Sequence, residues 1–324
     1  MKILHIFGGG PLVEFAIRKA EEIGYRTVVR TGPRFEASIG SPDCDFDLYV
    51  GETMVEVMSL GPLPSSGDIG LSLSAPWIIR QDVIDLFGGN LFNLHAQPLP
   101  KFRGAGGQSW RILMGDYAGG VSLHQLTSKV DGGKVVKTLS FDFPQHFKLP
   151  YEFDNLNHKM SETLLGKWLL EFSAKRFIEK GLSNDKSTES EYWPRLSTQD
   201  NGWVDWGWSL TDIEIFCRAF SAPYPGAQTF CGKTKVSILS VEIVPKRQYF
   251  HPFQQGLIFK IDDRIHVAHR HGVLIIKEWR TDAETQHLRL GDRLYTPNAI
   301  LESALTTRVQ YSPSGKVLGR ISNE

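Results

Sequence analysis

Three polar side chains in the middle of the chain have the types and the spacing for acid–base chemistry. Asn93 and His95 lie two residues apart, and alternate residues of an extended strand point to the same side. Asp131 follows them and is succeeded by two glycines, which let a backbone approach another group closely. An amide can donate to a developing oxyanion, an imidazole can move a proton, and a carboxylate can orient the imidazole or hold an amine. The set therefore suits acyl transfer to a nitrogen.

The segments around these residues predict elements that could bring them together. The prolines that follow His95 cannot continue a strand, so the chain must turn sharply before Gly104. A helix is predicted over Gln108–Met114, and a strand over Val121–Leu126 leads to Asp131. Polar groups at the ends of strands are where sites form in α/β proteins. We therefore expect one pocket at this place.

Earlier in the chain, alternating strand and helix patterns predict an α/β fold with a Rossmann-like, doubly wound sheet. The predicted strands are Lys2–Phe7, Tyr25–Val29, Asp45–Val50 and Ile69–Leu73, and the predicted helices are Val13–Ile23 and Gln81–Leu86. The glycines at 8–10 lack the third glycine of a dinucleotide fingerprint. We favour a plain strand-to-helix turn there over a dinucleotide site.

The sequence pattern N-x-H, L-P-K-F-R-G, G-D and V-D-G-G resembles the signature of the folate-dependent formyltransferases. The resemblance implies that Asn93, His95 and Asp131 are the catalytic residues. It also implies that the formyl donor, a cosubstrate, is N10-formyltetrahydrofolate and that the acceptor is a primary amine. No spacing of histidines and cysteines predicts a metal site.

The same resemblance implies folate contacts in two segments. One is an I-I-P-like turn, where packing against the sheet is the alternative, and the other follows the histidine. The implied residues are Trp77, Ile78 and Ile79, and Gln97, Pro98, Leu99 and Pro100. The second segment departs from the family's P-S-L-L-P, and Gly106-Gly107-Gln108 stands where an alanine and a proline are common. These departures bear on the identity of the acceptor more than on the reaction.

The carboxy-terminal part predicts a second domain. A long helix over Tyr151–Leu182, ended by Gly181, precedes a linker that resembles the family's P-R and I-D-W elements. A helix over Ser209–Phe220, capped by Ser209 or Thr211, is followed by a P-Y-P-G-A turn that the family shares. Period-two strands at Val236–Val244, Gly256–Ile261, Arg264–Ala268 and Val273–Glu278 predict a small OB-like β-barrel. We expect a catalytic domain over residues 1–200 and an OB-like domain over residues 201–324.

Several residues are candidates for binding the acceptor. They are Arg103, which could pair with a phosphate or brace its loop, and Trp193, Arg195 and Tyr224. His5, His124 and His146 lie outside the signature, and we expect them to be bystanders.

Composition separates the classes of function. Lysine plus arginine and aspartate plus glutamate both number 36, so the net charge of zero disfavours a nucleic-acid partner. We therefore favour a nucleotide-linked amino sugar as acceptor, with methionyl-tRNA as the alternative and a non-catalytic binding module as the third reading. Three cysteines and the lack of a signal peptide or a long apolar run predict a cytoplasmic protein away from membranes. The apolar carboxy-terminal strands could also pair between two chains, so a homodimer is left open.

Overall fold

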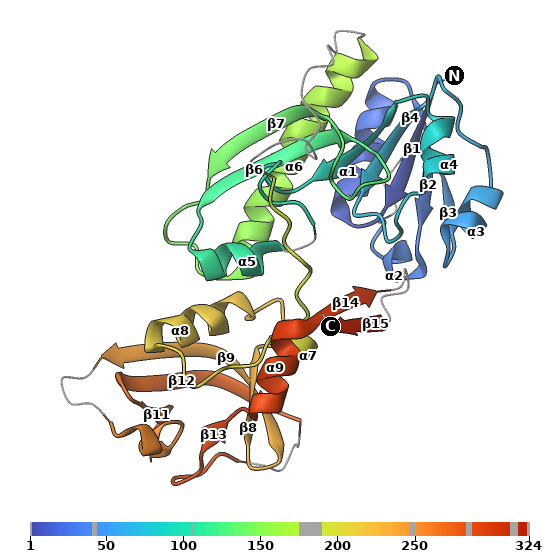
Figure 1. Ribbon diagram of the computed structural model, residues 1–324. Coiled ribbons are helices and arrows are strands. Elements are labelled where there is room, and N and C mark those ends of the chain that lie inside the picture. The colour runs from blue at the N-terminus through green and yellow to red at the C-terminus, as the bar shows by residue number, and fades with distance from the viewer. Residues whose placement is uncertain are drawn as a thin grey trace.

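The computed structural model describes residues 2–40, 44–104, 107–174, 190–245, 250–282, 287–311 and 317–322. The amino-terminal half is built on a seven-stranded sheet in the order β3-β2-β1-β4-β5-β6-β7 (Figure 1). Its strands are β1 (Ile3–Gly8), β2 (Arg26–Thr31), β3 (Phe46–Val50), β4 (Ile69–Leu73), β5 (Leu91–His95), β6 (Ala118–Gln125) and β7 (Val135–Asp142). Strands β1 to β5 are parallel, whereas β6 and β7 are antiparallel. The predicted α/β fold with a parallel central sheet is confirmed.

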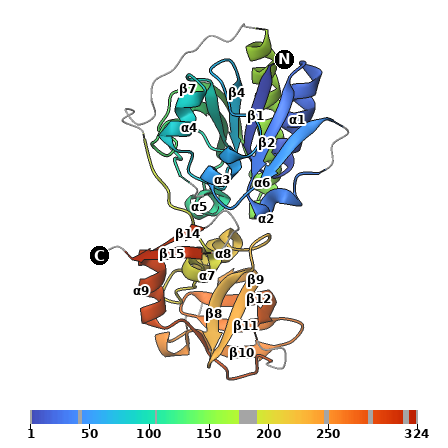
Figure 2. The ribbon, with the colours of Figure 1, turned by 90° about the vertical axis from the view of Figure 1, so that its right-hand side faces the viewer.

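Helices cover both faces of this sheet. α1 (Pro11–Glu22) and α6 (Pro150–Ser173) pack on one face, where Ile17 and Trp168 are buried. α3 (Met54–Ser59) and α4 (Gln81–Leu86) pack on the other, around Phe7 and Phe87. The short helices α2 (Pro33–Glu36) and α5 (Gly107–Met114) lie at the end that faces the carboxy-terminal half (Figure 2). Both layers leave the carboxyl ends of the central strands available for loops.

The carboxy-terminal half is a curled antiparallel sheet in the order β10-β11-β12-β9-β8-β13. Its strands are β8 (Ala227–Cys231), β9 (Thr234–Pro245), β10 (Ile258–Ile261), β11 (Ile265–His269), β12 (Gly272–Thr281) and β13 (Leu294–Tyr295). A bridge between Leu257 and Arg293 joins the two outer strands, so the sheet curls back on itself. Helix α8 (Leu210–Ala219) covers it, and Ser209 is its cap, with Oγ accepting from the Asp212 amide. The OB-like barrel stays a prediction.

Three further elements complete the described chain. α7 (Thr198–Asn201) begins the carboxy-terminal half, and α9 (Asn298–Thr306) leads into a hairpin of β14 (Thr307–Tyr311) and β15 (Val317–Ser322). The division of the chain at residue 200 stays a prediction, because one hydrophobic core crosses it. Ile112 and Phe153 from the amino-terminal half belong to the same buried cluster as Ile213. The two halves are therefore packed together through α5, α6 and α8.

The long helix was predicted too far. It ends at Ser173, where the side-chain Oγ donates to the Leu170 carbonyl, 2.9 Å away. Gly181, the predicted end, lies outside the described residues. Strands β7, β8 and β13 to β15, and helices α2, α3, α7 and α9, were not predicted.

Among the described helices, none is both long and apolar enough to cross a membrane.

Candidate active site

Strand pairing places four polar side chains on one face of the sheet. In the antiparallel pair of β5 and β6, Asn93 is directly opposite His124 and His95 is opposite Ser122. Opposed residues of an antiparallel pair point to the same face, as do residues two apart on one strand. Asn93, His95, Ser122 and His124 therefore form a block at the carboxyl end of β5. The predicted shared direction of Asn93 and His95 follows from this geometry.

His95 is held by a backbone carbonyl and faces a carboxylate. Its Nε2 lies 2.5 Å from the Phe102 carbonyl oxygen, which can only accept, so Nε2 carries the proton. Nδ1 lies 3.8 Å from Asp131 Oδ1, beyond hydrogen-bond distance. Burial lowers the pKa of His95, although Asp131 and the Phe102 carbonyl oppose that shift. A neutral ring with an unprotonated Nδ1 is therefore the form expected near pH 7.

Asp131 stands in a strained turn that the neighbouring loop stabilises. Its φ of 47° is in the left-handed region, which is rare for residues other than glycine. The Gly104 amide donates to Asp131 Oδ2 at 2.8 Å. Burial would raise the pKa of Asp131, but the adjacent His124 and His95 rings and the Gly104 amide lower this pKa to about 2. The carboxylate is therefore ionised at neutral pH.

The linker clamps the loop that holds Asp131. Gly104 has a φ of 92°, and a Cβ there would lie 2.5 Å from the Trp193 carbonyl oxygen, so the contact requires glycine. Arg103 donates to the Val130 carbonyl at 2.7 Å from Nη2 and to Ser190 Oγ at 3.2 Å from Nη1. Of the two roles considered for Arg103, the structure favours bracing the loop over pairing with a phosphate.

His124, expected to be a bystander, belongs to this site. Its Nε2 lies 3.0 Å from Asn93 Nδ2 and 3.5 Å from Asp131 Oδ1, and the side chain is 1% exposed. The pairing register of β5 and β6, which brings His124 to Asn93, was not known from the sequence. A signal was present, since Ser122 and His124 share the polar side of a strand whose other side is Val121 and Leu123.

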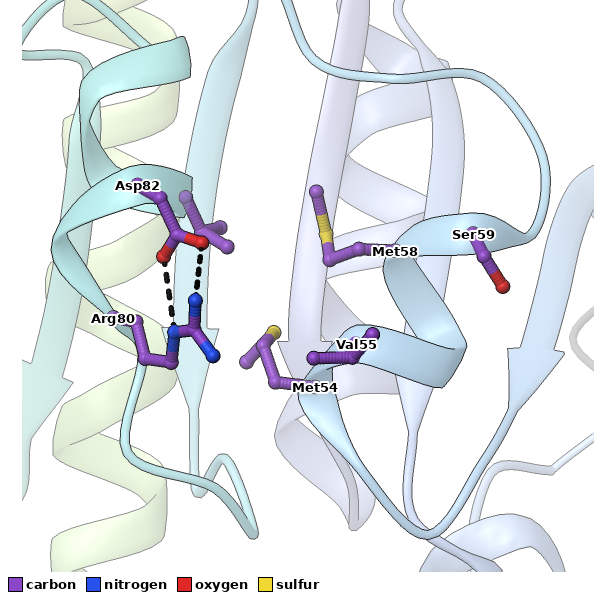
Figure 3. Close-up of a pocket in the computed structure, with 7 residues that line it drawn as sticks. Met54, Val55, Met58, Ser59, Arg80 and Asp82 are labelled. Carbon is purple, nitrogen blue, oxygen red and sulfur yellow. Dashed lines mark hydrogen bonds and ion pairs between the residues drawn. The ribbon is translucent and has the colours of Figure 1, made fainter.

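The first predicted folate segment has one open apolar side chain. Ile78 is 75% exposed, whereas Ile79 is 4% exposed and Trp77 packs against the same core cluster, so the alternative of packing against the sheet describes Trp77 but not Ile78. Trp77 Nε1 donates to the Glu52 carbonyl at 3.0 Å and ties this turn to the loop after β3. Next to the turn, a pocket of about 260 Å³ opens between α3 and α4 (Figure 3). Its lining is Met54, Val55, Met58, Ser59, Arg80, Asp82 and Val83.

In the second predicted folate segment, Gln97 and Leu99 are buried within the protein. Gln97 is 6% exposed and accepts from Arg111 Nη2 at 2.6 Å, and Leu99 is buried. Pro98 lines a second pocket of about 480 Å³ with Lys101, Phe102, Asp116, Ala118, Gly119, Ser140, Phe141 and Asp142. Pro100 is partly exposed. Of this segment, Pro98 and Pro100 are therefore the side chains that remain accessible to a ligand.

The predicted acceptor residues gather beside α5. The Trp193 and Trp110 rings lie 5.1 Å apart, and Trp110 Nε1 donates to the Pro194 carbonyl at 2.8 Å. Burial raises the pKa of Tyr224, which also lies within reach of the charge of Arg195. Three of the predicted acceptor residues thus lie between the two halves: Trp193, Arg195 and Tyr224. The fourth, Arg103, instead contacts the loop that carries Asp131.

In the described ranges, no group of three or more histidine, cysteine, aspartate or glutamate side chains is arranged to hold a metal ion.

Comparison with known proteins shows which protein family this chain resembles. A family model described as "Formyl transferase" matches residues 76–143, which include Asn93, His95, His124 and Asp131. A model described as "Formyl transferase, C-terminal domain" matches residues 196–287. The methionyl-tRNA formyltransferase of Pseudothermotoga lettingae is 28% identical over 212 residues, 65% of this chain and 67% of that protein. The bifunctional polymyxin resistance protein ArnA of Wigglesworthia glossinidia brevipalpis is 28% identical over 176 residues, 54% of this chain but 26% of that longer protein.

A solved structure shares the fold over most of the chain. The N-formyltransferase of Helicobacter canadensis, in complex with folinic acid and dTDP-3-aminofucose, superposes with a TM-score of 0.63 at 16% identity, covering 86% of this chain and all of that one. Both domain models of one family also match this chain in order along the sequence. The chain therefore belongs to the formyl transferase family, whose members transfer one-carbon groups.

Proposed function

We propose that this protein transfers the formyl group of N10-formyltetrahydrofolate to the primary amine of a nucleotide-linked amino sugar. The convergence of Asn93, His95 and Asp131 on one face of the β5 and β6 pair carries the proposal. An amide donor, a neutral imidazole and an ionised carboxylate are the groups that acyl transfer to an amine requires. The folate derivative and the dTDP-amino sugar named in the complex of the Helicobacter canadensis protein support the choice of both substrates.

The proposed reaction follows from the state of each side chain. The neutral amine attacks the formyl carbon, and the carbonyl oxygen becomes an oxyanion that accepts a hydrogen bond from Asn93 Nδ2. The attacking nitrogen loses a proton to His95 Nδ1, either directly or through the carboxylate of Asp131, which passes it on to Nδ1. The bond from carbon to N10 then breaks, N10 takes a proton from His95, and tetrahydrofolate and the N-formylated product leave. Atoms and charge balance without any further reactant.

Accessible residues support the proposed position of the folate. The pteridine ring of a folate has polar edges and broad faces, and small-molecule sites combine open apolar surface with a few polar groups. Ile78 and Pro98 provide open apolar side chains on the loops that follow β4 and β5. Trp77, Ile79, Gln97 and Leu99 are proposed to support these loops from behind. Pro100 completes the turn.

The acceptor is the less constrained part of the proposal. Trp193 and Tyr224 are proposed to flank the base or sugar, and Arg195 to pair with the phosphates. The balance of 36 basic and 36 acidic residues argues against tRNA, whose binding relies on basic surface. Methionyl-tRNA remains the second candidate because of the Pseudothermotoga lettingae relative. Action in the cytoplasm and assembly as a homodimer are retained as proposals.

The test is a formyl-transfer assay with N10-formyltetrahydrofolate, run in parallel on UDP- and dTDP-linked amino sugars and on methionyl-tRNA. We expect turnover of an amino sugar and none of tRNA. Formation of tetrahydrofolate should match formation of N-formyl sugar mole for mole. Turnover of tRNA alone would replace the proposed acceptor, and no turnover with any amine would reject the reaction itself.

A further inference from the structure

We propose that His124 is a positioning residue for formyl transfer, whose imidazole holds the Asn93 amide in the orientation that stabilises the oxyanion. The inference rests on the proposed function, because it assigns a role within that reaction. It is based on strand register, on two hydrogen bonds of the His124 ring and on the close packing behind this ring.

The hydrogen bonds of His124 define its tautomer. Nδ1 lies 2.9 Å from the Gln125 carbonyl oxygen, and a carbonyl can only accept, so Nδ1 carries the proton. In the neutral ring, Nε2 then carries a lone pair and no proton. This lone pair lies 3.0 Å from Asn93 Nδ2, so the amide N–H donates to it. The neutral His124 ring is therefore an acceptor toward Asn93.

An acceptor at this position determines how the Asn93 amide is oriented. If the amide rotated by half a turn, its carbonyl oxygen would face the lone pair of His124 Nε2, and two acceptors would meet without a proton. The amide therefore keeps its NH2 group toward His124, with one N–H bound and the second N–H available. An asparagine amide without such a partner has two nearly equivalent orientations. The second N–H is the donor that the oxyanion needs.

The backbone behind His124 keeps the ring in place. The Gln125 amide donates to the Lys134 carbonyl at 2.9 Å, which joins the strand end to the turn that carries Asp131. A Cβ at Gly133 would lie 1.7 Å from the Gln125 carbonyl oxygen and 3.3 Å from His124 Nδ1. Only glycine permits this approach. The loop of Asp131 and the ring of His124 are thus parts of one packed unit.

Four variants test the role: His124→Leu, His124→Gln, Asn93→Ala and the double variant Asn93→Ala with His124→Leu. Leucine removes the acceptor at similar volume, whereas the glutamine oxygen can accept from Asn93 in place of Nε2. We expect His124→Leu to lower kcat by about 10- to 100-fold, somewhat less than the ~10²–10³ expected for Asn93→Ala. KM for either substrate should change by less than about threefold, and His124→Gln should recover most of the lost kcat.

The double variant distinguishes positioning from structural support. If His124 acts through Asn93, the double variant should be no slower than Asn93→Ala alone, because the group to be oriented is gone. If His124 only supports the fold, its effect should multiply with that of Asn93→Ala. Multiplicative losses, or failure of His124→Gln to recover rate, would overturn the proposal.

His269 provides a matched control in the carboxy-terminal sheet. Its ring is also fully buried and bonds to a backbone carbonyl, that of Trp208, at 2.9 Å. His269→Leu should lower the thermal midpoint as His124→Leu does, yet leave kcat unchanged. The outcomes also separate the two proposals. An inactive wild-type protein rejects the reaction, whereas an active wild-type protein with an equally active His124→Leu variant rejects only the role of His124.

Discussion

Two histidines of the same sheet each face a carboxylate, and they differ in what else surrounds the ring. His5 lies within β1, is fully buried, and has Nε2 3.6 Å from Asp68 Oδ2. Its Nδ1 accepts from Arg30 Nη1 at 3.0 Å. Arg30 also donates to the carbonyls of Val57 at 3.0 Å, Leu60 at 3.3 Å and Pro62 at 2.6 Å. This cluster of His5, Arg30 and Asp68 joins the loop after α3 to the sheet.

The contrast with His95 lies in what remains available for chemistry. His95 is the last residue of β5, and within the described residues no hydrogen bond reaches its Nδ1. In the His5 cluster, by contrast, Arg30 donates a hydrogen bond to His5 Nδ1. Arg30 also donates to three backbone carbonyls. A histidine that faces a carboxylate thus supports the fold when it lies in the middle of a strand. At the carboxyl end of a strand, the same pair of residue types forms a candidate active site. Position along the strand decides, because loops at the strand end can admit a ligand.

The largest expected effect separates rate from stability. His95→Ala should lower kcat by ~10²–10⁴ through loss of the proton-transfer group. The free energy of unfolding should fall by only about 1 kcal/mol, for the lost bond to Phe102. Steady-state kinetics and urea denaturation of the same preparations measure both quantities. A His95→Ala variant with full turnover would contradict the comparison.

The reverse result is expected in the His5 cluster. Arg30→Met should lower the free energy of unfolding by roughly 3–5 kcal/mol, because the buried Val57 carbonyl loses its donor at ~1–3 kcal/mol and the part-buried carbonyls of Leu60 and Pro62 at ~1 kcal/mol each. Turnover per folded molecule should stay near the wild-type value. Arg18→Met, at an exposed ion pair with Glu14, is the matched control and should cost less than about 1 kcal/mol. Equal losses in the two variants would argue against a structural role for the cluster.

The pH dependence of stability should reflect the protonation of His5. Burial, followed by the charge of Arg30, lowers the pKa of His5 from 6.5 to about 4, against the pull of Asp68. A lowered folded-state pKa contributes stability that is complete above pH 6.5 and is lost as the pH falls from there to about 4. The loss integrates to roughly 3 kcal/mol. Denaturation between pH 4 and 7 should show this slope in the wild type, and His5→Gln should reduce it.

The pH dependence of the rate should instead reflect the protonation of His95. Because burial lowers the pKa of His95, its neutral form persists below the usual value of 6.5. Plots of kcat/KM should therefore fall on the acid side with a midpoint below 6.5, about tenfold per pH unit. His5→Gln should leave this limb in place. A rate that does not change between about pH 5 and 8 would remove His95 from proton transfer.

Much of the fold follows from local patterns. β4 and α4 have the predicted bounds, Ile69–Leu73 and Gln81–Leu86, because each is a short periodic run between turn residues. The edge strand β7 was missed, since its residues 135–142 alternate in burial only weakly. The end of α6 was missed because the apolar spacing of the sequence continues beyond Ser173, so no local pattern marks the end of the helix.

The sequence by itself determined that Asn93 and His95 share one side of a strand and that a glycine-rich turn carries Asp131. These facts depend on the period of a strand and on the conformations open to glycine, both of which are local. Only the tertiary structure decided that His124 faces Asn93, that the Phe102 carbonyl accepts a hydrogen bond from His95 Nε2 and that Arg103 donates to the Val130 carbonyl. Strand register and loop closure join residues far apart in the chain, and no local preference encodes which of them meet.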